Sequence, residues 1–143
     1  MVTSRQCIAK YGQPVAAMEY KHLTMWDIPD WINREIPVLP NRLYCNRDLI
    51  KPLQKAFENI IERCLQDQVI TWDGCFNIRN KRGYKSWSLH SWAIAIDINA
   101  ARNPLGKTPK MSKELVACFT DAGFDWGGTW KRKDGMHFQL QSI

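Results

Sequence analysis

The sequence is short of the residues that build several common kinds of site and scaffold. It has only three histidines and five cysteines among 143 residues, and no two cysteines form a Cys-x-x-Cys pair. An odd number of scattered cysteines excludes a disulfide framework and a cysteine-type zinc site. We therefore expect reduced and mostly buried thiols at the five positions, which are Cys7, Cys45, Cys64, Cys75 and Cys118.

Long apolar runs are also missing. No segment approaches the roughly 20 apolar residues that are needed to cross a bilayer. The N-terminus has no apolar stretch after a basic start, as a secretory signal would have, and the sequence contains no repeat or low-complexity tract. We expect one domain over residues 1–143 that is cytoplasmic unless something else releases it.

Charge is unbalanced in the basic direction. The chain has 20 lysines and arginines against 14 acidic residues, a net charge of +6. This excess favours an anionic partner, such as nucleic acid, an acidic membrane surface or a cell-wall polymer. The basic residues are spread along the chain, however, so a soluble mixed-charge surface with a basic bias explains them equally well.

Apolar spacing predicts the helices. A short helix is expected over about 4–11, a core helix has its apolar face over 53–65, and a third helix fits 112–123. Three prolines interrupt 26–44, which predicts an extended segment that wraps around the rest of the protein.

Period-two alternation predicts strands in the second half of the chain. Residues 93–99 and 136–140 each alternate between an apolar face and a second face with small or polar side chains. A turn is expected at 72–74 and a short strand at 75–79. Helices and strands without a regular parallel repeat predict an α+β fold, in which a small antiparallel β-sheet packs against helices.

Three short segments carry side chains that could bind one zinc ion. His90 precedes the first strand, Asp97 lies on its non-core face, and His137 lies on the same kind of face of the second strand. Two histidines and one carboxylate form a known catalytic zinc set with a fourth position open for water. A lone histidine is more often structural, but pairing of the two strands would bring all three ligands together.

The combined pattern resembles a family of zinc peptidases. Ser88-x-His90-x(6)-Asp97 followed by Asp134-x-x-His137 is similar to the D-alanyl-D-alanine carboxypeptidase and L-alanyl-D-glutamate endopeptidase group, which shares the hedgehog/DD-peptidase fold. The similarity covers about 72–140, the motif-bearing core. Residues 73–79, 88–92 and 123–128 resemble the phage endolysin branch in particular.

The resemblance implies one zinc ion per chain, bound by His90, Asp97 and His137. It also implies that Asp134 is the acid/base, which takes a proton from the attacking water and returns it to the leaving amine. The competing class is a non-catalytic, zinc-stabilised module that binds an anionic polymer or a protein. Asp134 discriminates between the two, because a pure binder does not need an acid three residues before a metal ligand.

The resemblance implies substrate contacts as well. An upstream arginine, either Arg79 or Arg82, is expected to bind a carbonyl or carboxylate of the substrate, and Ser88 is expected to support the site. Several tryptophans surround the motifs, of which Trp130 is the best candidate for a wall of the cleft. One departure is Ala93, where the family often has glycine.

These features predict a monomeric zinc metallopeptidase that hydrolyses peptide bonds in bacterial peptidoglycan. The missing signal peptide favours a phage endolysin with L-alanyl-D-glutamate endopeptidase activity, which acts on the cell wall after release inside an infected host. The alternative is a D-alanyl-D-alanine carboxypeptidase or dipeptidase. No nucleic-acid partner is expected, because the aromatic residues lie beside the metal motif rather than among basic residues along one surface.

Overall fold

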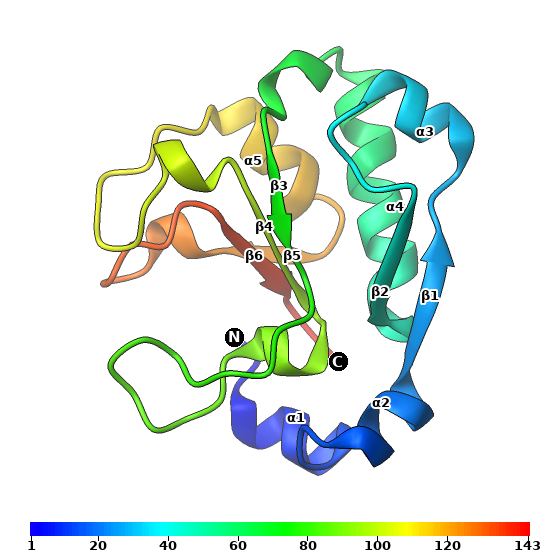
Figure 1. Ribbon diagram of the computed structural model, residues 1–143. Helices are drawn as coiled ribbons and strands as arrows, with labels where there is room; N and C mark the ends of the chain where they lie inside the picture. The colour runs from blue at the N-terminus through cyan, green and yellow to red at the C-terminus, as the bar shows by residue number, and fades with distance from the viewer.

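Four antiparallel strands form the sheet that carries the metal motif (Figure 1). The computed structural model describes all residues 1–143. The strand order in this sheet is β3-β4-β6-β5. Its strands are β3 (Trp72–Gly74), β4 (Ala95–Ile98), β5 (Phe124–Trp126) and β6 (His137–Leu140). The helices are α1 (Ser4–Tyr11), α2 (Ala16–His22), α3 (Asp30–Glu35), α4 (Arg47–Glu62) and α5 (Lys113–Thr120). The expected α+β class with antiparallel pairing is confirmed.

The N-terminal half contains a second sheet, which was not predicted because prolines interrupt this part of the sequence. β1 (Leu23–Asp27) and β2 (Arg42–Asn46) pair antiparallel, with α3 between them in the chain. The expectation of an extended, wrapping segment over 26–44 is therefore wrong. Pro29 is the N-cap residue of α3, a position where the missing N–H of proline does no harm. The prolines thus mark the ends of short elements rather than preventing them.

The predicted turn and strand after residue 71 are also wrong. Residues 72–74 form β3, and no strand covers 75–79. Gly74 has a φ of +134° at a shift in register between β3 and β4, which allows the chain to leave the sheet there. Beyond that point the backbone bonds instead to the turn that holds His90, because the Asn77 N–H donates to the His90 carbonyl at 3.1 Å.

The three expected helices are present, and their caps explain their bounds. α1 begins after Thr3, whose side chain forms a capping box with Gln6, and it ends at Gly12. α4 begins at Arg47, earlier than the apolar face alone indicates, because the Asn46 side chain accepts from the Asp48 N–H. α2 and α3 were not predicted.

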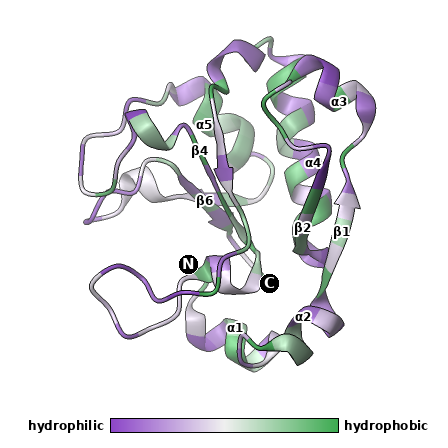
Figure 2. Ribbon diagram, viewed as in Figure 1, coloured by the Kyte–Doolittle hydropathy of each residue, from purple (hydrophilic) through white to green (hydrophobic).

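One cluster of 32 buried apolar residues, from Val2 to Leu140, joins both sheets and the helices. α4 lies between the four-stranded sheet and the β1–β2 pair (Figure 1). Apolar stretches colour α4, β2 and β4, whereas the long loop after β3 is polar (Figure 2). All five cysteines are free, and four of them are buried. None of the helices has the length and apolar character of a membrane span.

Candidate metal centre

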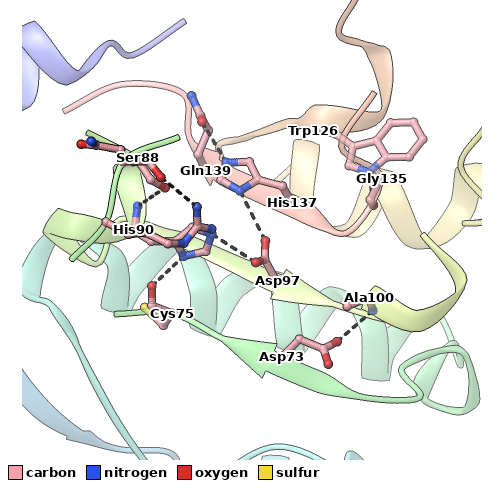
Figure 3. A network of polar contacts seen from close by, with 12 residues as sticks. Asp73, Cys75, Ser88, His90, Asp97, Ala100, Trp126, Gly135, His137 and Gln139 are labelled. Atoms are coloured by element: carbon pink, nitrogen blue, oxygen red, sulfur yellow. Dashed lines mark hydrogen bonds and ion pairs between the residues drawn. The ribbon is translucent and has the colours of Figure 1, made fainter. Parts of the chain in front are cut away.

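Strand register brings two of the predicted ligands together. β4 and β6 pair antiparallel with Asp97 directly opposite His137, so their side chains project from the same face of the sheet. His90 comes from η2 (Leu89–Trp92), the 3₁₀ turn that leads into β4. One ligand atom from each of the three residues lies within 4.8 Å of the others, and Figure 3 shows both imidazoles directed at the Asp97 carboxylate.

Two local features of η2 hold His90 in this position. The buried Ser88 side chain caps the turn and accepts from the His90 N–H at 3.3 Å. At the other end, Ala93 has a φ of 52° and a ψ of 40°, in the left-handed region. Glycine adopts this conformation without strain, which explains why glycine is common at this position in the family that the sequence resembles.

Hydrogen bonds to the far nitrogen of each ring determine which nitrogen faces Asp97. The His90 Nδ1 lies 2.6 Å from the Cys75 carbonyl, and the His137 Nε2 lies 2.9 Å from the Gln139 Oε1. Both partners are acceptors, so these two nitrogens carry the hydrogen. The other nitrogens, His90 Nε2 and His137 Nδ1, are left with lone pairs at 3.2 Å and 3.3 Å from the carboxylate oxygens of Asp97.

This donor set fits a metal cation. His90 Nε2 and Asp97 Oδ1 are both buried and have no hydrogen-bond partner, although such groups are rarely left unsatisfied. Burial alone would raise the pKa of Asp97, and only hydrogen bonds and positive charge from His137 and His90 lower it well below its usual range. With both rings neutral, a bound cation would supply that charge. Two lone pairs and an ionised carboxylate that face one another are stabilised by positive charge between them. Two histidines and one carboxylate are the ligands that zinc takes in catalytic sites.

Asp134 lies beside this centre, between η4 (Gly127–Thr129) and β6. Its N–H donates to the Gly127 carbonyl at 2.9 Å, and its own carbonyl accepts from the His137 N–H at 3.1 Å. Burial raises the pKa of the Asp134 carboxyl, while His137 opposes the rise. A carboxylate whose pKa is raised toward the working pH is suited to both accept and return a proton.

A cavity of about 550 Å³ contains the centre, a size typical of small-molecule and peptide sites. All the site residues predicted from the sequence line this cavity: Arg79, Arg82, Ser88, His90, Asp97, Trp130, Asp134 and His137. The ring of Trp130 lies 5.3 Å from that of His137. Of the other three tryptophans near the motifs (Trp87, Trp92 and Trp126), none lines the cavity.

The two arginines differ in how firmly they are held. Ser91, which is fully buried, accepts from the Arg79 N–H and donates to the Arg79 carbonyl, at 3.2 Å and 3.1 Å. Arg79 is also one of the charges that oppose the raised pKa of Asp134, whereas Arg82 is exposed on the following loop. Arg79 is therefore the arginine that lies near the acid and has both of its backbone groups bonded to a buried side chain.

Three contributors to the site were not identified from the sequence. They are the carbonyl of Cys75, the hydroxyl of Ser91 and the side chain of Gln139. A backbone carbonyl has no signature in the sequence. Gln139 does have one, because a polar residue two positions after His137 in a strand lies on the same face. The Gln139 amide also donates to the Val2 carbonyl at 3.4 Å, so the N-terminus reaches the metal centre.

Residues 82–140 match a family model described as D-alanyl-D-alanine carboxypeptidase. The match covers less than half of the chain, but it includes His90, Asp97, Asp134 and His137. It supports a peptidase of the zinc-dependent family that the motifs resemble, and the family is described by the carboxypeptidase rather than the endopeptidase activity. Comparison with curated proteins and with solved structures gave no match.

Proposed function

We propose that the protein is a zinc-dependent peptidase that hydrolyses peptide bonds in the stem peptides of bacterial peptidoglycan. One observation carries the proposal: one ligand atom from each of His90, Asp97 and His137 lies within 4.8 Å of the others, in a cavity that Asp134 also lines. A module that only binds has no use for the half-buried carboxyl of Asp134 beside its metal ligands. The family match over 82–140 supports the same reaction class.

In the proposed reaction, His90, Asp97 and His137 hold the metal. A bound zinc ion supplies the Lewis acidity that activates a water for attack on a carbonyl. The Asp134 carboxylate accepts the proton of the attacking water and then donates it to the leaving amine, so the acid ends each cycle ionised. The Arg79 guanidinium binds the oxygen on which negative charge develops, a contribution worth about 100-fold or more in similar sites.

The bond that we favour is the one between L-alanine and D-glutamate, and the biological role that we favour is that of a phage endolysin. Such a protein acts on the cell wall after release from the cytoplasm of an infected host, as one zinc-loaded monomer. Release of D-alanine from the end of the stem is the second candidate, and the description of the matching family favours it.

The decisive experiment compares three proteins on purified peptidoglycan. Wild-type protein should bind one zinc and release new amino groups, and mass spectrometry of the digest identifies the bond. Asp134→Ala should keep its fold and its zinc but lose most of the activity. Asp125→Ala, a change of a half-buried aspartate in β5 outside the cavity, should remain active.

Each outcome has a distinct meaning. New D-glutamate amines support the endopeptidase, and free D-alanine supports the carboxypeptidase. Wild-type activity of Asp134→Ala would show that the acid/base assignment is wrong. A zinc-loaded wild type that releases neither product would leave the non-catalytic binding module as the better description.

A further inference from the structure

Two loops that flank the metal cavity carry an excess of cations. We call these residues the basic rim: Arg79, Lys81, Arg82, Lys131, Arg132 and Lys133. The protein has five ion pairs, and none of them involves a residue of the basic rim. Only two carboxylates, Asp97 and Asp134, line the metal cavity. The local charge of the rim is therefore available to a ligand.

Arg132 joins the two loops and is held in place. Its Nη1 donates to the Arg82 carbonyl at 2.7 Å, and its guanidinium lies 5.1 Å from the centre of the Tyr84 ring. The Lys133 carbonyl accepts from the Gly106 N–H at 2.7 Å, which ties a third loop to the same segment. These contacts hold the backbone carbonyls of Arg82 and Lys133 and leave the remaining N–H groups of Arg132 without a partner.

A second hollow of about 580 Å³ adjoins the metal cavity. Tyr84, Lys131 and Arg132 line both hollows. The second hollow is lined by Tyr84, Gly106, Thr108, Lys131, Arg132 and Lys133, with no acidic residue among them. A substrate peptide that extends from the metal centre in this direction thus enters a region whose only charged side chains are positive.

We propose that the second hollow is a subsite for a further carboxylate of the substrate, several bonds away from the bond that is cleaved. The proposal rests on the proposed peptidase function and specifies its substrate as a peptide with at least one remote carboxylate. Guanidinium and ammonium groups are the natural partners of a carboxylate. A terminal D-alanyl-D-alanine unit carries its one carboxylate next to the bond, whereas an internal bond of an acidic stem peptide leaves a carboxylate that can reach this subsite.

The experiment measures binding, separately from turnover. The probe is a synthetic L-alanyl-D-glutamyl peptide extended by two residues, with its C-terminal carboxylate either free or amidated. Titration calorimetry on zinc-loaded Asp134→Ala protein compares three versions: no further change, Lys131→Ala with Lys133→Ala, and Lys51→Ala with Lys55→Ala. Lys51 and Lys55 are exposed on α4, away from both loops (Figure 1), so this matched control removes the same charge elsewhere.

Amidation of the peptide should weaken its binding to the zinc-loaded Asp134→Ala protein by about three- to tenfold, the size expected for a few exposed ion pairs. The same loss should occur in the Lys51/Lys55 control and should be clearly smaller in the Lys131/Lys133 variant, in which Arg132 is the one cation left in the second hollow. Equal affinity of the zinc-loaded Asp134→Ala protein for both peptides would overturn the proposal, and so would a loss of the same size in the Lys131/Lys133 variant. Failure of wild-type protein to cleave peptidoglycan would be a separate result, because it counts against the proposed function and not against the subsite.

Discussion

The Oε1 of Gln139 lies 2.9 Å from the Nε2 of His137, while the amide nitrogen of the same glutamine donates to the Val2 carbonyl. The carbonyl of Val2 fixes which end of the amide faces the imidazole, because only the nitrogen can donate to it. An amide oxygen can only accept, so the Nε2 of His137 carries the hydrogen and its Nδ1 is free to bind a metal. Gln139 therefore sets the tautomer of His137 without being a metal ligand itself.

Substitution of this glutamine should weaken metal binding without unfolding the protein. Gln139→Leu removes the acceptor, and loss of such an outer partner typically lowers metal affinity by about 10- to 100-fold. Gln139→Glu keeps an acceptor and should retain most of the affinity. Competition with a coloured chelator measures the zinc affinity of each variant. Gln141→Leu, an exposed position just after β6, serves as the control, and an unchanged affinity of Gln139→Leu would contradict the assignment.

Removal of the metal should lower the thermal stability. The proposed zinc ion would bind only the assembled ligands of the folded state, so free zinc at 100 times its dissociation constant should add about 2.7 kcal/mol to the free energy of unfolding. For a chain of this size this corresponds to roughly 5–10 °C in Tm. Calorimetry with zinc and with chelator measures the shift. His22→Ala, which changes the one histidine outside the centre, should show the full shift, and His137→Ala should show almost none.

Gly127 leaves room for Asp134, and a side chain there should displace the acid. A Cβ built at Gly127 would lie 2.5 Å from the Asp134 carbonyl oxygen and 2.9 Å from its Cβ, closer than atoms in contact can approach. Gly127→Ala should therefore reduce hydrolysis by at least about tenfold, because a small misplacement of a catalytic group has large effects. Zinc binding should change less. Thr129→Ala, an exposed change in the same turn, should be close to wild type in a peptidoglycan assay.

Salt should slow hydrolysis of the intact cell wall more than it affects stability. The net charge of +6 favours encounter with an anionic polymer. Screening shortens the reach of that attraction from about 10 Å at 0.1 M salt to about 3 Å at 1 M. The metal ligands interact over shorter distances and should be little affected. Turbidity clearing measured beside Tm from low to high salt checks this, and a salt-independent rate would show that the basic excess serves only solubility.

The parts of the fold that follow from local periodicity could be predicted from the sequence. Alternation at 93–99 and 136–140 indicated two strands, and their pairing explains why Asp97 meets His137. The β1–β2 sheet could not be predicted in this way, because its short strands have little alternation and their pairing depends on contacts across 15 or more residues. The capping pattern at Thr3 and Gly12 is local, and the bounds of α1 were accordingly predicted correctly.

The residues of the candidate site were also predictable only in part. Side chains that bind the metal have a recognisable type and spacing, whereas the groups that orient them often do not. The acceptor for His90 is the backbone of Cys75, and its position depends on how the chain leaves β3 at Gly74. Ser91 is an ordinary serine in the sequence, and only the folded structure shows that its hydroxyl bonds to both backbone groups of Arg79.

The first twelve residues are connected to the metal centre at two points. The Val2 carbonyl accepts from Gln139, and the Gly12 carbonyl accepts from the Trp92 indole at 2.8 Å, two residues after His90. We therefore expect docking of this segment and metal binding to be thermodynamically linked, in which case each strengthens the other by the same factor. Metal loading should slow amide hydrogen exchange in α1, and a protein whose N-terminal segment is detached should hold its zinc less tightly.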